Sequence, residues 1–277
     1  MEVLIQLKKF LINLKNKQNF KQSKLLRRNK AIFKGVSLIL LIGILSFGLL
    51  PPKKITVYLI GDSTMANKET NTFPETGWGM PFQYYFDTTV TVDNRAKNGA
   101  STRTFMEEGL WISVMQALKA DDYVFIQFGH NDEVPTKKSY TTPQQFKENL
   151  LKFVQDARSK NAIPILITPA ARRQFDSAGN VINTHPMYSD LVIEVASANN
   201  VPLINLDSMS RALLKQLGPE KSKFLWINLV KGENPHYPNG RVDNTHFNEL
   251  GARKMAELVL QDIEQLHLDL VNRIQFR

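Results

Sequence analysis

The chain has 277 residues, 43% of them hydrophobic and none of them cysteine, which is enough for one sizeable core and excludes disulfides, thiolate metal sites and cysteine nucleophiles. The formal net charge of +9 lies in residues 1–35, which hold ten Lys or Arg and one acid, while the remainder holds 25 bases and 25 acids. A nucleic-acid-binding protein would carry its basic excess on the folded domain, so nucleic acid is rejected as a partner.

Residues 1–54 are predicted to form a basic leader that ends in a short linker. The segment 35–52 is uncharged and follows Arg27, Arg28, Lys30 and Lys34, an order typical of a secretory signal or a signal anchor. Apolar residues also recur at helical spacing among the first lysines, as in a helix that lies on a membrane surface. A buried core helix is the alternative, and the one-sided charge disfavours it. We expect export of the domain 55–277, with membrane contact through the leader alone, either cleaved or retained as an anchor.

The domain is predicted to alternate strands and helices. Residues 55–60 form an apolar, β-branched run that predicts a buried strand, and similar runs occupy 123–128, 163–168 and 201–206. Apolar residues at helical spacing predict helices over 146–157 and over 252–263, the second with a possible cap at Asn248. Continuous apolar strands between amphipathic helices favour an α/β fold with a parallel sheet that is covered on both faces.

Two short polar loops follow the first two predicted strands. Gly61-Asp62-Ser63-Thr64 comes after the first strand, and Gly129-His130-Asn131-Asp132 comes after the second. Ligands of such sheets bind beyond the carboxyl ends of the strands, and parallel strands bring both loops to the same edge. We therefore expect the functional site between these loops.

The residue types around this edge suit nucleophilic catalysis by serine. A serine hydroxyl needs a base, usually a histidine oriented by a carboxylate, and its tetrahedral intermediate needs hydrogen-bond donors. Ser63 stands just past the first strand, and a loop could fold Asp243 toward His246, three residues on. Asn131 and the backbone N–H of Gly99 are candidate oxyanion donors, since glycine lets the backbone approach a ligand closely.

Each of these features also has an ordinary structural interpretation. Gly-Asp-Ser alone is a common turn, and Asp243 could cap a turn or a helix. Arg172 and Arg173, after the third strand, could bind an acidic substrate or face water. The five histidines show no metal-binding spacing such as His-Glu-x-x-His, so we expect no metal ion.

The order of four motifs resembles the SGNH (GDSL-like) hydrolases. Gly-Asp-Ser-Thr, Asn-Gly-x-Ser, Gly-His-Asn-Asp and Asp-x-x-His follow one another over residues 57–260. Other segments resemble the rhamnogalacturonan acetylesterase family, namely Tyr58-Leu59-Ile60-Gly61-Asp62-Ser63-Thr64-Met65-Ala66, Gly77-Trp78-Gly79, Asn94-Arg95-Ala96, Ser101-Thr102-Arg103-Thr104-Phe105, Thr184-His185-Pro186-Met187-Tyr188 and Asp243-Asn244-Thr245-His246-Phe247.

The resemblance implies a flavodoxin-like three-layer α/β/α sandwich and a role for each site residue. Ser63 would be the nucleophile, His246 the base and Asp243 its orienting partner. The N–H groups of Ser63 and Gly99 and the side chain of Asn131 would form the oxyanion hole, and no cofactor is implied.

The implied reaction is removal of O-acetyl groups from plant cell-wall rhamnogalacturonan through an acyl-Ser63 intermediate. We expect the protein to be a monomer. Because this substrate is a polyanion, we expect Arg103, Arg172 and Arg173 to contribute to its binding. The alternatives are an esterase for xylan or another acetylated glycan and a membrane-tethered transacylase that passes acetyl to a sugar. A sugar-binding protein on an inactive esterase fold is a further alternative, but it would be expected to lack Ser63 or His246.

Overall fold

The computed structural model describes residues 53–275, together with residues 1, 2, 8, 10, 15, 17, 18, 20–22, 24 and 26. The chain separates into two units, Met1–Lys53 and Lys54–Arg277, and the fold below is that of the second. The predicted membrane segment 35–52 and the apolar residues of the predicted surface helix before it lie outside the described residues. In the part of the chain that is described, every helix is too short or too polar to cross a membrane.

A five-stranded parallel sheet lies at the centre of the domain, in the order β2-β1-β3-β4-β5. This is the flavodoxin-like order, in which the chain reverses direction across the sheet between β1 and β3. The strands are β1 (Ile55–Gly61), β2 (Val90–Asn94), β3 (Tyr123–Gln127), β4 (Ile163–Ile167) and β5 (Leu203–Ile204). Four of the five were predicted. The fourth predicted strand is shorter than expected, because Asn205 caps the next helix, which begins at Leu206.

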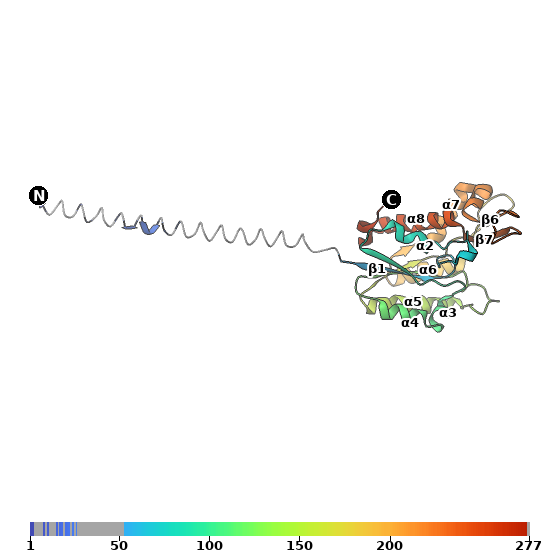
Figure 1. The fold of residues 1–277 in the computed structure, drawn as a ribbon. Coiled ribbons are helices and arrows are strands. Elements are labelled where there is room, and N and C mark those ends of the chain that lie inside the picture. The colour runs from blue at the N-terminus through green and yellow to red at the C-terminus, as the bar shows by residue number, and fades with distance from the viewer. Residues whose placement is uncertain are drawn as a thin grey trace. The chain divides into compact units, whose positions relative to one another are not determined.

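Helices cover both faces of this sheet (Figure 1). One face carries α2 (Gly79–Phe82), α7 (Leu206–Lys221) and α8 (Glu249–Gln265). The other carries α3 (Thr102–Glu107), α4 (Leu110–Ala117), α5 (Pro143–Ser159) and α6 (Pro186–Ala198). Short 3-10 turns complete the domain: η1 (Thr70–Thr72), η2 (Gln83–Tyr85), η3 (Ser222–Leu225) and η4 (Asp269–Arg273). The predicted three-layer α/β/α sandwich is therefore confirmed.

The strands divide their side chains between two hydrophobic cores. In β1, Val57 and Leu59 enter the core under α2, α7 and α8, while Tyr58 and Ile60 enter the core under α3 to α6. Successive residues of a strand point to opposite faces, and here both faces are covered. This is why apolar residues in β1 occur on both faces of the strand instead of alternating with polar ones.

The two predicted helices are present and begin earlier than their first apolar residues. α5 starts with Pro143, after Thr142, whose side chain and that of Gln145 cap each other's backbone N–H groups. α8 starts after Asn248, whose side chain accepts a hydrogen bond from Gly251 N at 3.0 Å. The cap predicted at Asn248 is thus confirmed, and both extra turns come from polar capping residues.

A separate antiparallel hairpin stands outside the central sheet. Its strands are β6 (Trp226–Leu229) and β7 (Arg241–Phe247), so Asp243 and His246 lie on a strand and not on the expected loop. Residues three apart on a regular strand point to opposite faces. Here Phe247 pairs with Trp226 while Asp243 pairs with the adjacent Ile227, so residues 244–246 bulge out of the register. The bulge allows the two side chains to meet.

Candidate active site

Ser63 sits on a tight turn at the carboxyl end of β1. The preceding Asp62 is fully buried, and its Oδ1 accepts from the N–H and the hydroxyl of Thr64 at 2.9 and 2.8 Å. The Asp62 carbonyl accepts from the N–H groups of Met65 and Ala66 at 3.2 and 3.0 Å. These bonds fix the turn on both sides of Ser63, as an Asx turn does. The serine hydroxyl is therefore held at the sheet edge by backbone geometry.

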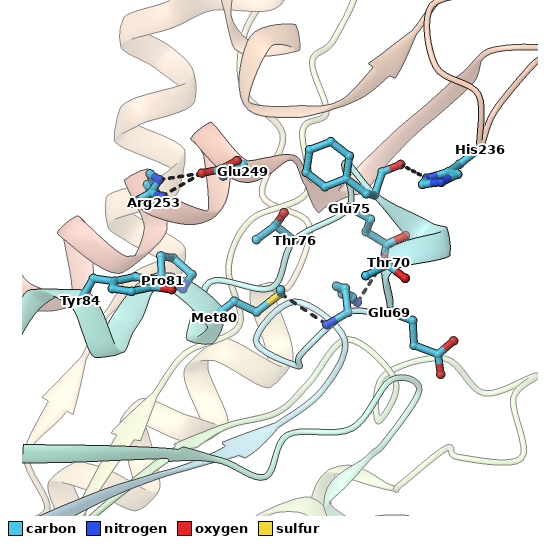
Figure 2. A pocket seen from close by; sticks show the side chains of 12 residues that line it. Glu69, Thr70, Glu75, Thr76, Met80, Pro81, Tyr84, His236, Glu249 and Arg253 are labelled. Carbon is cyan, nitrogen blue, oxygen red and sulfur yellow. Dashed lines mark hydrogen bonds and ion pairs between the residues drawn. The ribbon is translucent and has the colours of Figure 1, made fainter.

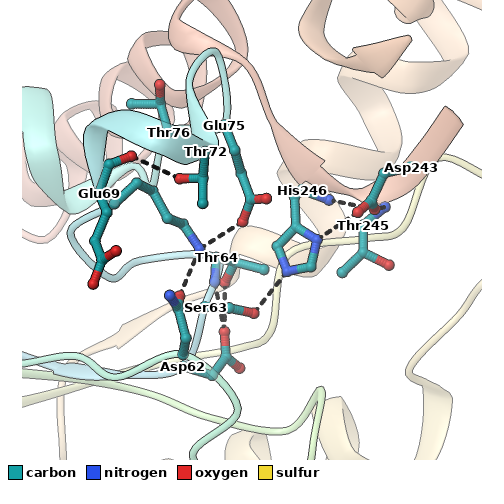
Figure 3. A network of polar contacts seen from close by, with 12 residues as sticks. Asp62, Ser63, Thr64, Glu69, Thr72, Glu75, Thr76, Asp243, Thr245 and His246 are labelled. Carbon is teal, nitrogen blue, oxygen red and sulfur yellow. Dashed lines mark hydrogen bonds and ion pairs between the residues drawn. The ribbon is translucent and has the colours of Figure 1, made fainter. Parts of the chain in front are cut away.

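Ser63, His246 and Asp243 form a continuous chain of hydrogen bonds (Figure 3). Ser63 Oγ lies 2.8 Å from His246 Nε2, and His246 Nδ1 lies 2.8 Å from Asp243 Oδ2. Asp243 Oδ1 accepts from the backbone N–H groups of Thr245 and His246 at 2.9 and 3.1 Å. The structure thus brings together the three side chains that the sequence selected, in the arrangement that lets a histidine take a serine proton.

Electrostatics keeps the Asp243 carboxylate ionised. Its burial opposes ionisation, but the hydrogen bond and positive charge of His246 and the backbone N–H donors outweigh the burial and lower the pKa of Asp243 from its usual value. Arg241 adds a second cation, since its guanidinium lies 2.7 Å from Asp243 Oδ2. Asp243 can therefore stabilise a positive imidazole without taking up a proton itself.

A network of ion pairs that the sequence did not reveal extends from Asp243 toward the Gly99 loop. Glu75 bridges Lys68 Nζ at 2.8 Å and Arg241 at 3.4 Å, and the Lys68 and Glu75 side chains are only 2% and 9% exposed. Lys68 also donates to Asn98 Oδ1 at 2.6 Å. Glu75 therefore joins the strand that carries His246 to the loop that carries Gly99. No local motif marks Glu75, so only the fold could identify it.

Two of the candidate oxyanion donors, Gly99 and Asn131, line one cavity of about 360 Å³. Gly99 has φ +78°, and the space beside its Cα is open. Asn131 Nδ2 donates to Ala100 O at 3.0 Å, which leaves its second N–H for another acceptor. The N–H groups of Ser63 and Gly99 donate to no group among residues 53–275. These three groups therefore have N–H donors left over for a ligand, and oxyanion stabilisation requires such donors.

The two arginines after β4 hold the bulge of β7. The Arg172 guanidinium donates to Thr245 Oγ1 at 2.6 Å and pairs with Glu133 at 3.2 Å. Arg173 is 9% exposed, and its N–H and guanidinium bond to the backbone O and Oδ1 of Asn244 at 2.7 and 2.9 Å. Both arginines therefore contact the residues between Asp243 and His246. For Arg173 in particular, these contacts favour a structural role over the expected contact with substrate.

Arg103 likewise uses its guanidinium within the protein. It pairs with Glu107 one helical turn along α3 at 2.7 Å, and it donates to the backbone carbonyls of Lys138 and Tyr140. These bonds tie the loop that follows Asn131 to the first turn of α3. The geometry therefore indicates that Arg103 positions this loop, and that its guanidinium is not used to contact the substrate directly.

Buried polar residues behind the Gly-His-Asn-Asp loop fix its position. Asp132 Oδ1 accepts from the N–H and hydroxyl of Thr102 at 2.9 and 2.6 Å, and burial raises the pKa of Asp132 to about 6. His130 packs edge-on against His185 at 4.3 Å, and His185 Nδ1 lies 2.8 Å from Glu133. Burial, with the nearby His185 and Arg172, keeps the pKa of His130 well below its usual value. His130 thus stays neutral as a packing residue. Within residues 53–275, no group of three or more His, Asp or Glu could hold a metal ion.

Lys68 and Glu75 also line a larger cavity of about 570 Å³ (Figure 2). Its wall includes the half-exposed Phe73 and the exposed Tyr84. His236, from the loop between β6 and β7, closes it through a 2.9 Å hydrogen bond from Nδ1 to the Phe73 carbonyl. Aromatic rings next to ion-paired side chains give this cavity both apolar and polar surfaces.

Comparison with known proteins identifies a family and named relatives. Residues 59–254 match the GDSL-like Lipase/Acylhydrolase family. The chain is 41% identical over 226 residues to rhamnogalacturonan acetylesterase RhgT of Bacillus subtilis (strain 168). The matched region covers 81% of this chain and 96% of RhgT. It is 36% identical over 220 residues to "Probable rhamnogalacturonan acetylesterase YesY" of the same strain, covering 79% of this chain and 96% of YesY.

The fold has a similar neighbour among solved structures. The crystal structure of YxiM from Bacillus subtilis superimposes with a TM-score of 0.68 at 28% sequence identity, covering 79% of this chain and 58% of YxiM.

Proposed function

The chain belongs to the GDSL-like lipase/acylhydrolase family, and we propose that it is a carbohydrate acetylesterase that removes O-acetyl groups from rhamnogalacturonan. Two relatives named for this activity match almost their whole length. The observation that carries the proposal is the hydrogen-bond chain from Ser63 through His246 to Asp243, because it is the machinery that acyl transfer to serine needs.

In the proposed reaction, Ser63 Oγ attacks the acetyl carbonyl carbon as His246 Nε2 takes its proton. The negative oxygen that forms is stabilised by the N–H groups of Ser63 and Gly99 and by Asn131 Nδ2. His246 then gives its proton to the departing sugar oxygen, which leaves acetyl on Ser63. Water attacks this acyl group as His246 takes its proton, and His246 returns that proton to Ser63 Oγ as the acyl–oxygen bond breaks and acetate leaves. Asp243 stays ionised throughout and orients the imidazole.

Acetate release from matched polysaccharides tests the substrate. The purified protein is expected to release acetate faster from acetylated rhamnogalacturonan than from acetylated xylan, and the Ser63→Ala variant should release almost none from either. Faster release from xylan would refute the substrate and leave the esterase mechanism intact. Repeating the assay with an added sugar acceptor separates hydrolysis from transfer, because a transacylase would yield acetylated acceptor in place of free acetate.

We propose in addition that the catalytic domain is exported, with residues 1–34 left inside. The support is the basic flank followed by the uncharged segment 35–52. Protease added to intact spheroplasts should digest the domain, and full protection would refute export. N-terminal sequencing of the mature protein then tells whether the leader is removed.

A further inference from the structure

The cavity beside Gly99 and Asn131 is bordered by three lysines and one acidic residue. Its lining comprises Lys97, Asn98, Gly99, Ala100, Thr104, Glu108, Asn131, Lys137, Lys138 and Ser139. The folded domain as a whole has balanced charge, since 25 bases and 25 acids follow residue 35. A positive excess at this cavity is therefore a local feature, next to the donors that we assign to the oxyanion.

Two of the three ammonium groups keep their charge uncompensated. Lys97 forms an ion pair with Glu108 across the cavity rim. Lys137 Nζ donates to Asn131 Oδ1 at 3.0 Å, and this acceptor is a neutral amide. The Lys138 ammonium has no ion-pair or hydrogen-bond partner among residues 53–275. Positive charge therefore remains beside Asn131, where an anionic group would be attracted.

The backbone that carries these two lysines is anchored. Arg103 donates to the carbonyls of Lys138 and Tyr140, and Ser139 Oγ donates to the Asn131 carbonyl at 3.3 Å. The arginine that the sequence suggested for substrate binding thus supports the loop from beneath. The lysines extend from a fixed backbone, which lowers the entropic cost of ordering a binding loop.

We propose that this cavity binds the carboxylate of an acetylated uronic acid unit, with Lys138 and Lys137 as its cationic ligands. An acetylated uronic acid carries its ester and its carboxylate on one sugar ring. When the ester carbonyl oxygen lies at Gly99 N–H and Asn131 Nδ2, the carboxylate lies within one ring width of that point, where the lysines stand. An ammonium attracts a carboxylate as a point charge and tolerates several ring orientations. The inference rests on the proposed function, which supplies the substrate class.

Paired substrates that differ only at the carboxylate test this inference. Acetylated rhamnogalacturonan oligosaccharides are compared with the same oligosaccharides methyl-esterified at their carboxyl groups and matched in acetyl content. The measured quantity is the ratio of kcat/KM for acetate release from the free acid to that from the methyl ester. We expect a ratio of about ten or more at low ionic strength, decreasing as salt screens the charges.

Lysine variants then test whether the preference for the free acid over the methyl ester depends on Lys137 and Lys138. Lys137→Gln combined with Lys138→Gln should bring it close to one, whereas Lys138→Arg should keep most of it. Lys160→Gln is the matched control, because Lys160 follows α5 at the opposite edge of the sheet and should leave the ratio unchanged. Because each ratio compares two substrates of one enzyme, a general loss of turnover in a variant does not disturb it.

The outcomes separate the inference from the proposed function. A wild-type ratio of one, or an unchanged ratio in the double variant, would overturn the carboxylate subsite while acetate release still supports the acetylesterase. Absence of acetate release from both forms by the wild-type protein would overturn the proposed function, and the subsite with it.

Discussion

The two halves of the candidate active site are held in place by different kinds of interaction. Ser63 leaves a central strand, and the turn around it is fixed by backbone hydrogen bonds and the buried Asp62. Asp243 and His246 stand on a hairpin outside the main sheet, with side chains 16% and 22% exposed, and charged side chains hold that hairpin.

This difference indicates how each half should fail. The position of Ser63 depends on the packing of the core. A substitution in the core beneath it should therefore reduce the stability of the protein before it reduces the catalytic rate. The base side depends on Arg172, Arg173 and Arg241, so a substitution there should first reduce the rate. The comparison can be tested by perturbing one side at a time.

The largest expected effect comes from the reacting groups themselves. Ser63→Ala and His246→Ala should each lower turnover of p-nitrophenyl acetate by about a thousand-fold or more, because nucleophile and base act as a unit. Asp243→Asn should also lower turnover, but by less than either of these changes, since the imidazole loses the partner that orients it and keeps its own base function. A folded Ser63→Ala variant with a tenth of the wild-type activity would exclude Ser63 as nucleophile. Circular dichroism serves as the folding control.

Gly77→Ala should destabilise the part of the fold that holds the Ser63 turn. A Cβ at this position would lie 2.0 Å from the carbonyl oxygen of Ala66, the residue that ends the Ser63 turn. Because a backbone atom must move, we expect a loss of about 4 kcal/mol in the free energy of unfolding. Gly232→Ala is the control, since its φ is +82° but its added Cβ meets no atom within 4 Å. A loss in urea unfolding no larger than that of Gly232→Ala would mean that the contact with Ala66 is relieved at little cost.

The buried Asp132 should make stability depend on pH. Burial raises its pKa from 3.8 to about 6 in the folded protein, so the folded state binds more protons than the unfolded state between these values. The associated stability is complete below about pH 4 and is lost as pH rises through about 6. Relative to Asp132→Asn, the wild-type protein should therefore lose about 3 kcal/mol of unfolding free energy across this window. A constant difference between the two proteins over the same range would contradict the raised pKa.

The smallest expected effect is on the base side. Arg172→Gln removes the ion pair to Glu133 and weakens the hold on Thr245, so kcat should fall about tenfold, by misalignment of His246. The decrease should be similar for p-nitrophenyl acetate and for acetylated glycans. Arg211→Gln, which breaks a comparable pair with Asp207 on α7, should leave kcat unchanged. A rise in KM confined to acidic substrates would instead return Arg172 to the substrate-binding role that the sequence suggested.

The sequence revealed the nucleophile side more completely than the base side, for a physical reason. Apolar runs and the polar turns that follow them are local, so β1, β3 and the positions of Ser63 and Asn131 could be read directly. β2 was missed because Thr91 and Asp93 interrupt its apolar pattern at the sheet edge. The sequence suggested substrate binding for Arg172 and Arg173, but their hydrogen-bond partners Thr245 and Asn244 lie more than 70 residues away in the chain. Such distant side-chain pairs leave no periodic signal.

The loop between β6 and β7 lines the large cavity and also contacts the residues that position His246. Tyr237 donates to Thr72 O at 2.9 Å and accepts from Arg241 at 3.0 Å, and Arg241 in turn holds Asp243. An insertion or deletion in residues 230–240 would therefore alter the wall of the large cavity and the position of Asp243 together. Any redesign of this wall through the loop would meet that trade-off. Phe73 and Tyr84, which line the same cavity without bonding to the Asp243 network, offer a starting point that leaves the base undisturbed.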